Sequence, residues 1–182
     1  MNKFAKHIPN TLTILNMSIG ISVVLLLQAD HAHKSIIAAA LICLGAIVDF
    51  FDGFLARKLN AMSDLGKQLD SFADIITFGI APILLVNYIT SPISPNPMVV
   101  GSLAFMLAGA YRLARFNMAD FSKHFLGLPI PVAGVSLAVY TLLYPLWSAI
   151  LPQIVGTAAT SIFMLALAIM MISKKKVKRI GK

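Results

Sequence analysis

Five of the seven acidic residues in this chain fall within the stretch 49–74, and the chain contains no glutamate. In order, they are Asp49, Asp52, Asp64, Asp70 and Asp74. Residues three or four apart share one face of a helix, so Asp49 pairs with Asp52 and Asp70 pairs with Asp74. Because a short polar segment, 58–65, lies between the pairs, we expect them on neighbouring antiparallel helices. Asp64 falls in the turn, off this pattern, and is expected to face water.

Converging carboxylates need a partner, because like charges repel strongly where little water is present. A divalent cation removes the conflict. No Cys or His lies nearby, and all-oxygen ligation suits a hard ion such as Mg²⁺ or Mn²⁺, which also binds substrate phosphates. The four paired aspartates therefore predict a divalent-cation site suited to phosphate chemistry.

Small residues accompany the aspartates. Gly53 follows Asp52, Ala56 lies one turn later, and Gly66 precedes Asp70 by one turn. Such residues let a ligand or a second helix approach the backbone closely, although glycine and alanine also pack transmembrane helices without a ligand. Arg57, at the end of the first helix, can pair with a phosphate.

The elements that carry these residues are membrane helices. The chain is 58% hydrophobic and only 12% charged, with a mean hydropathy of +0.85, whereas soluble domains carry about 25% charged residues. A helix needs about 20 apolar residues to cross the hydrocarbon core. The apolar runs predict one all-α domain, 1–182, with six transmembrane helices at 9–29, 34–57, 66–90, 97–118, 129–147 and 151–173.

The basic residues predict the orientation. With six spans, all of the 15 Lys and Arg residues except Lys34 fall on one side, and such residues favour the cytoplasm. Both termini and the acidic hairpin are therefore expected in the cytoplasm. No extramembrane domain presents the basic residues, which argues against a nucleic-acid partner and favours membrane lipids. The compact chain, without an evident targeting segment, favours a bacterial plasma membrane.

A second polar group lies at the cytoplasmic end of the fourth span. Arg112 and Arg115 share a helical face, and Asn117 follows. Arginines at a membrane edge can bind a carboxylate or a lipid phosphate bidentately, so these residues are candidates for the acceptor or lipid-phosphate site. A topology anchor is the equally weighted alternative.

At fixed spacings, the hairpin reads Asp49-x2-Asp52-Gly53-x2-Ala56-Arg57-x8-Gly66-x3-Asp70-x3-Asp74. This pattern resembles, without departure, the signature of the CDP-alcohol phosphotransferases. The resemblance extends over the chain: "IPNTLTILN" (8–16) is similar to the family's first helix. The segments "SFADIITFGIAP", "YRLARFN" and "FLGLPIPVAG" are similar to its bacterial phosphatidylserine synthase branch.

The resemblance implies a six-helix domain, usually a homodimer, with a polar cavity open to the cytoplasm. It implies transfer of a phosphatidyl group from CDP-diacylglycerol to an alcohol, L-serine in this branch, with release of CMP. Carried over by position, Asp49, Asp52 and Asp70 would ligate metal, and Asp74 would be a further ligand and the general base. The implied nucleotide site comprises Gly53 and Ala56 beside the cytidine, Arg57 on the diphosphate, and, as weaker candidates, Asn10 and Thr13; Gly66 adds room for the ligand.

Two alternatives stay open. Glycerol 3-phosphate or inositol phosphate could replace serine as acceptor, although a phosphorylated acceptor needs additional cationic groups. A divalent-cation transporter also uses buried aspartates. However, the first, fifth and sixth spans contain no carboxylate that could continue a path across the bilayer.

Overall fold

The apolar runs form long helices in a computed structural model that describes residues 8–90, 95–118, 125–173 and 176–177. The elements are α1 (Ile8–Gln28), α2 (Lys34–Lys58), α3 (Asp64–Asp74), η2 (Ile75–Ile80), α4 (Ala81–Thr90), α5 (Pro95–Met118), β1 (Phe125–Leu126), α6 (Ile130–Ser148), α7 (Gln153–Ile172) and β2 (Lys176–Val177). Five helical segments are long and apolar enough to cross a membrane, and Ile130–Leu146 forms a shorter apolar helix. The prediction of an all-α membrane fold is confirmed, with all six predicted segments helical.

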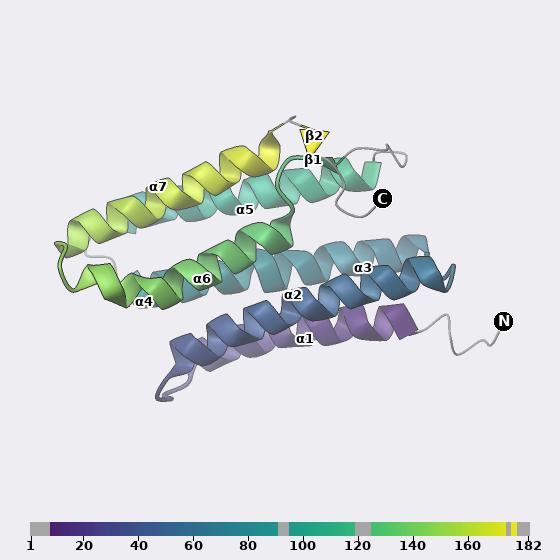
Figure 1. The fold of residues 1–182 in the computed structure, drawn as a ribbon, viewed down its shortest axis with the longest axis horizontal. Coiled ribbons are helices and arrows are strands. Elements are labelled where there is room, and N and C mark those ends of the chain that lie inside the picture. The colour runs from purple at the N-terminus through teal and green to yellow at the C-terminus, as the bar shows by residue number, and fades with distance from the viewer. Residues whose placement is uncertain (1–7, 91–94, 119–124, 174–175, 178–182) are drawn as a thin grey trace.

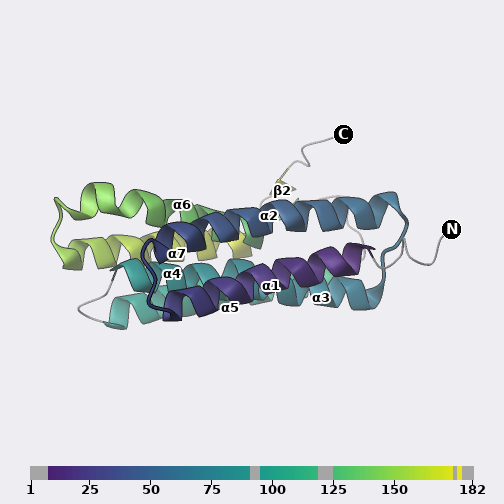
Figure 2. The same cartoon turned by 90° about the horizontal axis from the view of Figure 1, so that it is seen from below.

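The helices lie roughly side by side along one axis (Figure 1). In that view α1 and α2 form one edge of the bundle, α3, α4 and α6 lie between, and α5 and α7 form the opposite edge. Turned by 90°, α6 and α7 are seen to stop well short of the end at which α2 turns into α3 (Figure 2). At that end α1, α2, α3 and α5 project beyond α6 and α7.

One end of the bundle gathers the start of α1, the α2–α3 turn and the end of α5 (Figure 1). Arg57, Lys58 and Lys67 therefore lie at the opposite end from Lys34, in agreement with the predicted asymmetry. Arg112 and Arg115 lie in the last turns of α5, at the same end as Arg57, and Lys176 lies in β2. The other basic residues of that prediction lie outside the described residues: Lys3, Lys6, Lys123 and the rest of the tail.

The turn between α2 and α3 has local causes. Asn60 adopts a left-handed backbone with φ of 48°, which asparagine tolerates better than most residues. Ser63 caps α3, because its Oγ accepts a hydrogen bond from the Gly66 amide at 3.0 Å. These two residues end one helix and begin the next within a few positions, so the two acidic helices run antiparallel.

The third span was expected to be a regular helix, but its middle, η2, is π-helical. The Ala81 amide bonds the Ile76 carbonyl, five residues back. At this point α6 approaches closely, since a Cβ on Gly134 would lie 2.7 Å from the Phe78 carbonyl oxygen. Single π-helical turns inside α-helices are frequent at functional sites, and this one begins directly after Asp74.

A cluster of buried apolar side chains contributed by most of the helices forms the core of the bundle. Its largest fully buried side chains include Phe78, Phe105, Ile42 and Leu85, contributed by η2, α5, α2 and α4. Helices α5 and α7 meet at Gly101, where an added Cβ would lie 2.8 Å from Ser161 Oγ. Small residues at such contacts let membrane helices approach closely.

A two-residue antiparallel pair, not predicted from the sequence, joins the start of α6 to the end of α7. Phe125 pairs with Val177 and Leu126 with Lys176. Gly127 follows with φ of +77°, and a Cβ there would lie 2.3 Å from the Met171 carbonyl oxygen. Glycine is therefore required at this turn, which fixes where α6 begins.

Candidate active site

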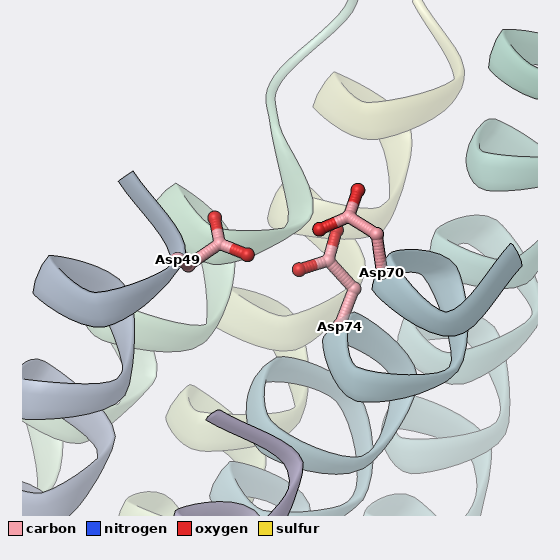
Figure 3. A group of neighbouring side chains, drawn as sticks. All are labelled: Asp49, Asp70 and Asp74. Carbon is pink, nitrogen blue, oxygen red and sulfur yellow. The ribbon is translucent and has the colours of Figure 1, made fainter. Parts of the chain in front are cut away.

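Three carboxylates meet between α2 and α3. Asp49, Asp70 and Asp74 each offer one oxygen, and these oxygens all lie within 4.8 Å of one another. Asp49 points from α2 toward the two aspartates of α3 (Figure 3). Asp74 is buried, with 6% of its surface exposed, and the other two are half-buried. This spacing suits ligation of a single cation by all three side chains.

Asp52, expected as a ligand alongside these three, lies outside the three-carboxylate group. It is buried, and its Oδ2 is 2.9 Å from the hydroxyl oxygen of Thr13 on α1. Thr13, expected beside the nucleotide, is thus in contact with an aspartate. Asp64, expected to face water, is exposed in the first turn of α3.

A residue that sequence reasoning missed contacts Asp49. Asn16 of α1 is fully buried, and its Nδ2 donates a hydrogen bond to Asp49 Oδ1 at 3.3 Å. The signal was present in the sequence, because Asn10, Thr13 and Asn16 recur every three residues along one side of a mostly apolar helix. Helix α1 therefore supplies a polar face to the acidic helices.

Two arginines interact electrostatically with the aspartates. Arg57, exposed at the end of α2, interacts with Asp52 and Asp70. Arg112 of α5, only 7% exposed, interacts with Asp74. Four carboxylates facing two guanidinium groups leave an excess of negative charge that a divalent cation would neutralise. Asp74 Oδ1 is also buried without a hydrogen-bond partner, which fits a role as a metal ligand.

The small residues of the motif differ in their surroundings. A Cβ on Gly53 would meet only the Arg57 guanidinium, at an ordinary contact distance of 3.5 Å. A Cβ on Gly66 would lie 2.9 Å from Asn10 Oδ1, so Gly66 allows α3 to pack against the start of α1. Ala56 is half-buried. A side chain would therefore fit at Gly53 in ordinary contact with Arg57, whereas Gly66 has a packing role.

The candidate acceptor residues on α5 separate into two groups. Arg112 interacts electrostatically with Asp74, and its Nε is buried without a hydrogen-bond partner. Arg115 lies toward α7, where its Nη1 donates to the Ile172 carbonyl at 3.3 Å. Of the two, Arg112 is the one that lies beside the carboxylates with an unused donor.

Asn117 joins α5 to α3. Its Nδ2 donates to Ser71 Oγ at 2.9 Å, and its backbone carbonyl accepts from Lys67 Nζ at 2.9 Å. Its Oδ1 is buried without a hydrogen-bond partner. Sequence reasoning did not assign Ser71 or Lys67 to the site, and no spacing pattern singles out either of them. Both lie on the helix that carries Asp70 and Asp74, so they fix α5 against it.

An open groove of about 660 Å³ runs between α2 and α6. Its walls are mostly apolar side chains of α6, from Pro131 to Leu143, together with Phe163 of α7. Asp49 is the one charged side chain among its described lining residues. The carboxylate cluster thus borders a surface that suits hydrocarbon.

A family model described as CDP-alcohol phosphatidyltransferase matches residues 6–180. The chain is 37% identical over 139 residues to the CDP-diacylglycerol–serine O-phosphatidyltransferase of Bacillus subtilis, covering 76% of this chain and 77% of that protein.

Two archaeal proteins are also similar. A protein of Methanocaldococcus jannaschii with the same name is 37% identical over 131 residues, which cover 71% of this chain but only 58% of that protein. The archaetidylserine synthase of Methanothermobacter thermautotrophicus is 32% identical over 176 residues, covering 95% of this chain and 70% of that protein. Each of the three names refers to transfer to serine or to a serine lipid.

Proposed function

Because the chain belongs to the CDP-alcohol phosphatidyltransferase family, as the motif predicted, we propose that it transfers the phosphatidyl group of CDP-diacylglycerol to L-serine. The products are phosphatidylserine and CMP. The names of the relatives support an enzyme of the phosphatidylserine synthase type. The observation that carries the proposal is the meeting of Asp49, Asp70 and Asp74 within 4.8 Å, on the two helices of the family motif.

The carboxylates would bind Mg²⁺ or Mn²⁺. Asp49, Asp70 and Asp74 are the ligands that the spacing supports, and Asp52 would contribute through the oxygen that Thr13 leaves free. Bound cations would neutralise the negative charge that develops on the CMP leaving group. The excess of carboxylates over guanidinium groups and the orphaned Asp74 Oδ1 both fit such a group.

Asp74 is proposed as the general base. The serine hydroxyl oxygen attacks the phosphorus of the phosphatidyl group, the bond from that phosphorus to the CMP oxygen breaks, and the hydroxyl proton passes to Asp74. A carboxylate in this role must reach the hydroxyl within hydrogen-bond distance. The buried position of Asp74 beside Arg112 supports the role, because Arg112 can hold the serine carboxylate at the same place.

The nucleotide would lie at the end of α2. Gly53 and Ala56 would border the cytidine and Arg57 the diphosphate, which the position of the Arg57 guanidinium beside Gly53 supports. Asn10 of α1 and Gly66 of α3 lie close together and would border this site on the side of α1. Thr13 would act through Asp52 and contact the nucleotide only indirectly.

The acceptor subsite would lie between α3 and α5. Arg112 is proposed to bind the serine carboxylate, because its buried Nε has no partner and arginine binds carboxylates bidentately. The free Oδ1 of Asn117 suits the serine ammonium group, which needs an acceptor. Arg115, bonded to the end of α7, would bind lipid phosphate or fix α7.

The lipid would extend away from this site through the groove between α2 and α6. Acyl chains are apolar, as is the α6 wall, and Asp49 places the charged cluster at the groove's border. The polar site would open to the cytoplasm, with both termini on that side, in a bacterial plasma membrane. The placement of Arg57, Lys58 and Lys67 at the end of the bundle opposite Lys34 supports this orientation. The homodimer and the single domain over 1–182 remain predictions of the family resemblance.

Release of CMP tests the reaction. Purified protein in detergent, supplied with CDP-diacylglycerol and Mn²⁺, is expected to release CMP with L-serine and to form phosphatidylserine. Glycerol 3-phosphate and inositol phosphate are the competing acceptors, and a phosphatidylglycerol phosphate product would overturn the choice of serine while keeping the chemistry. No CMP with any acceptor, together with cation flux into vesicles, would favour the transporter.

A further inference from the structure

We propose that Asn16 is a positioning residue for the carboxylate cluster, an inference that rests on the proposed cation site. Its side-chain amide fixes the orientation of Asp49 relative to Asp70 and Asp74. Asn16 itself does not contact the reacting groups. It acts through Asp49, to which its Nδ2 donates a hydrogen bond at 3.3 Å.

The burial of Asn16 needs an explanation. The side chain is fully buried in the middle of an apolar helix, and its Oδ1 has no hydrogen-bond partner. An unsatisfied buried amide oxygen is unfavourable, and leucine would fill similar space without that cost. The bond to Asp49 is therefore what distinguishes asparagine from an apolar residue here.

Helix α1 serves both aspartates of α2 in the same way. Thr13 contacts Asp52 and Asn16 contacts Asp49. Since α1 and α2 run antiparallel, a step of three residues forward on α1 matches a step of three residues back on α2. Each carboxylate thus has one donor from α1, and one of its oxygens is engaged there.

Asn16 is itself held in place by the third span. Thr77 of η2 donates its hydroxyl hydrogen to the Asn16 backbone carbonyl at 2.9 Å. Thr77 fits between two glycines, because a Cβ would lie 2.5 Å from Thr77 Oγ1 if added to Gly20 and 2.7 Å from Thr77 Cγ2 if added to Gly45. Thr77 follows Asp74 by three residues, so the same contact ties Asn16 to the helix that carries the other carboxylates.

The consequence concerns the free oxygen of Asp49. With Oδ1 engaged by Asn16, the carboxylate plane is fixed and the other oxygen remains for a cation. Without the amide, Asp49 can rotate, and the three oxygens are no longer preorganised. Hydrogen-bond partners of metal ligands typically change metal affinity by about 10- to 100-fold when they are removed.

Thermal stability of the full-length protein in detergent, measured against Mn²⁺ concentration without substrate, tests the inference. The Asn16→Leu variant is expected to raise the half-maximal Mn²⁺ concentration about tenfold or more. At saturating Mn²⁺, its turnover is expected to recover toward the wild-type value.

Asn87→Leu is the matched control. Asn87 also lies in a membrane-spanning segment, and its Nδ2 lies 2.9 Å from the Ile83 carbonyl oxygen and 3.3 Å from Ser102 Oγ, in the contact between α4 and α5. This variant is expected to melt at a lower temperature with an unchanged Mn²⁺ titration. An equal rise of the half-maximal Mn²⁺ concentration in both variants would make Asn16 an ordinary structural residue and overturn the inference.

The remaining outcomes are also decisive. A flat wild-type titration would refute the proposed cation site itself. A normal wild-type titration with an unchanged Asn16→Leu curve would refute only the role of Asn16. If Asn16→Leu does not fold, Asn16→Ala is judged by the same criteria. Failure of both to fold, beside a folded Asn87→Leu, would assign Asn16 to folding and overturn the positioning role.

Discussion

The contact of α1 with α2 and the contact of α5 with α7 both depend on glycine, but they direct polar atoms differently. At the first contact, Thr13 and Asn16 reach across to carboxylates of the neighbouring helix. At the second, the α7 hydroxyls of Thr157 and Thr160 bond carbonyls one turn back on their own helix, and Ser161 donates to the Pro97 carbonyl of α5. At the first contact the polar side chains bond carboxylates of the neighbouring helix, whereas at the second the three hydroxyls bond backbone carbonyls.

The difference in hydrogen-bond partners indicates that the α1–α2 contact orients carboxylates, whereas the α5–α7 contact serves packing. Hydroxyls that bond backbone carbonyls are satisfied without fixing a charged side chain, so α5 and α7 can pack closely. Side chains that reach a carboxylate on another helix fix its direction, which packing does not require. A chain selected only for stability would use the second arrangement throughout, because buried carboxylates are costly in a membrane, at about 2.5 to 3.5 kcal/mol for each Asp at a helix centre.

The largest effect is expected at Asp74. Asp74→Asn should lower turnover by about 10²- to 10⁴-fold, the usual contribution of a general base, while nucleotide binding is retained. Turnover and binding of a CDP-diacylglycerol analogue are measured separately. Near-normal turnover would show that Asp74 is not the general base. The carboxylates beside the α1–α2 contact would then lack an assigned proton acceptor.

The next effect separates the aspartates that meet from the one that does not. Asp70→Asn should abolish the rise in melting temperature caused by Mn²⁺, because it removes one of three converging ligands. Asp64→Asn is the control, since Asp64 lies on the same helix but is exposed, and it should titrate like the wild type. Loss of the Mn²⁺ effect in both variants would indicate that only the overall negative charge matters.

Arg112 should affect the acceptor. Arg112→Gln is expected to raise the KM for serine about tenfold or more, because a hydrogen bond to a charged group contributes about 1.5 to 3 kcal/mol. Its KM for CDP-diacylglycerol should change less. Lys58→Gln removes one positive charge from an exposed position at the same end of the bundle and should leave the KM for serine unchanged; a matching rise there would contradict a specific site.

The smallest effect tests the two glycine contacts directly. Gly101→Ala and Gly45→Ala each place a Cβ too close to a neighbouring helix, and overpacking costs about 1 to 3 kcal/mol, so both should lower the melting temperature. Only Gly45→Ala should also lower turnover, because Gly45 contacts Thr77 and Asn16. Equal turnover in the two variants would erase the distinction between the contacts.

Much of the fold could be predicted from the sequence, because hydrophobic runs and basic residues follow directly from the membrane. The approach of Asp49 to Asp70 and Asp74 was also predictable. The spacing places each aspartate pair on one helical face, and the short turn makes the two helices antiparallel neighbours. The separate position of Asp52 was not predictable. It depends on Thr13, and which helix supplies a donor to a carboxylate is decided by packing between distant parts of the chain.

The different partners of Arg112 and Arg115 could not be predicted from the sequence either. The two residues share a helical face by spacing, yet one lies beside Asp74 and the other bonds the end of α7. The direction of each depends on where α7 ends and on the turn at Gly127, both of which are tertiary features. Asn16 was detectable as a polar residue in an apolar helix, but its partner was not.

The π-helical segment η2 separates two demands on the third span. A π-helical turn holds more residues than an α-helical turn, and each residue of an α-helix advances about 100° around the axis. The face that α4 turns to the core is therefore out of phase with the face on which α3 carries Asp70 and Asp74. The side of the span that packs in the core at α4 thus differs from the side that carries the carboxylates at α3. We therefore expect that substitutions in the core face of α4 can alter core packing without changing the direction of Asp70 and Asp74.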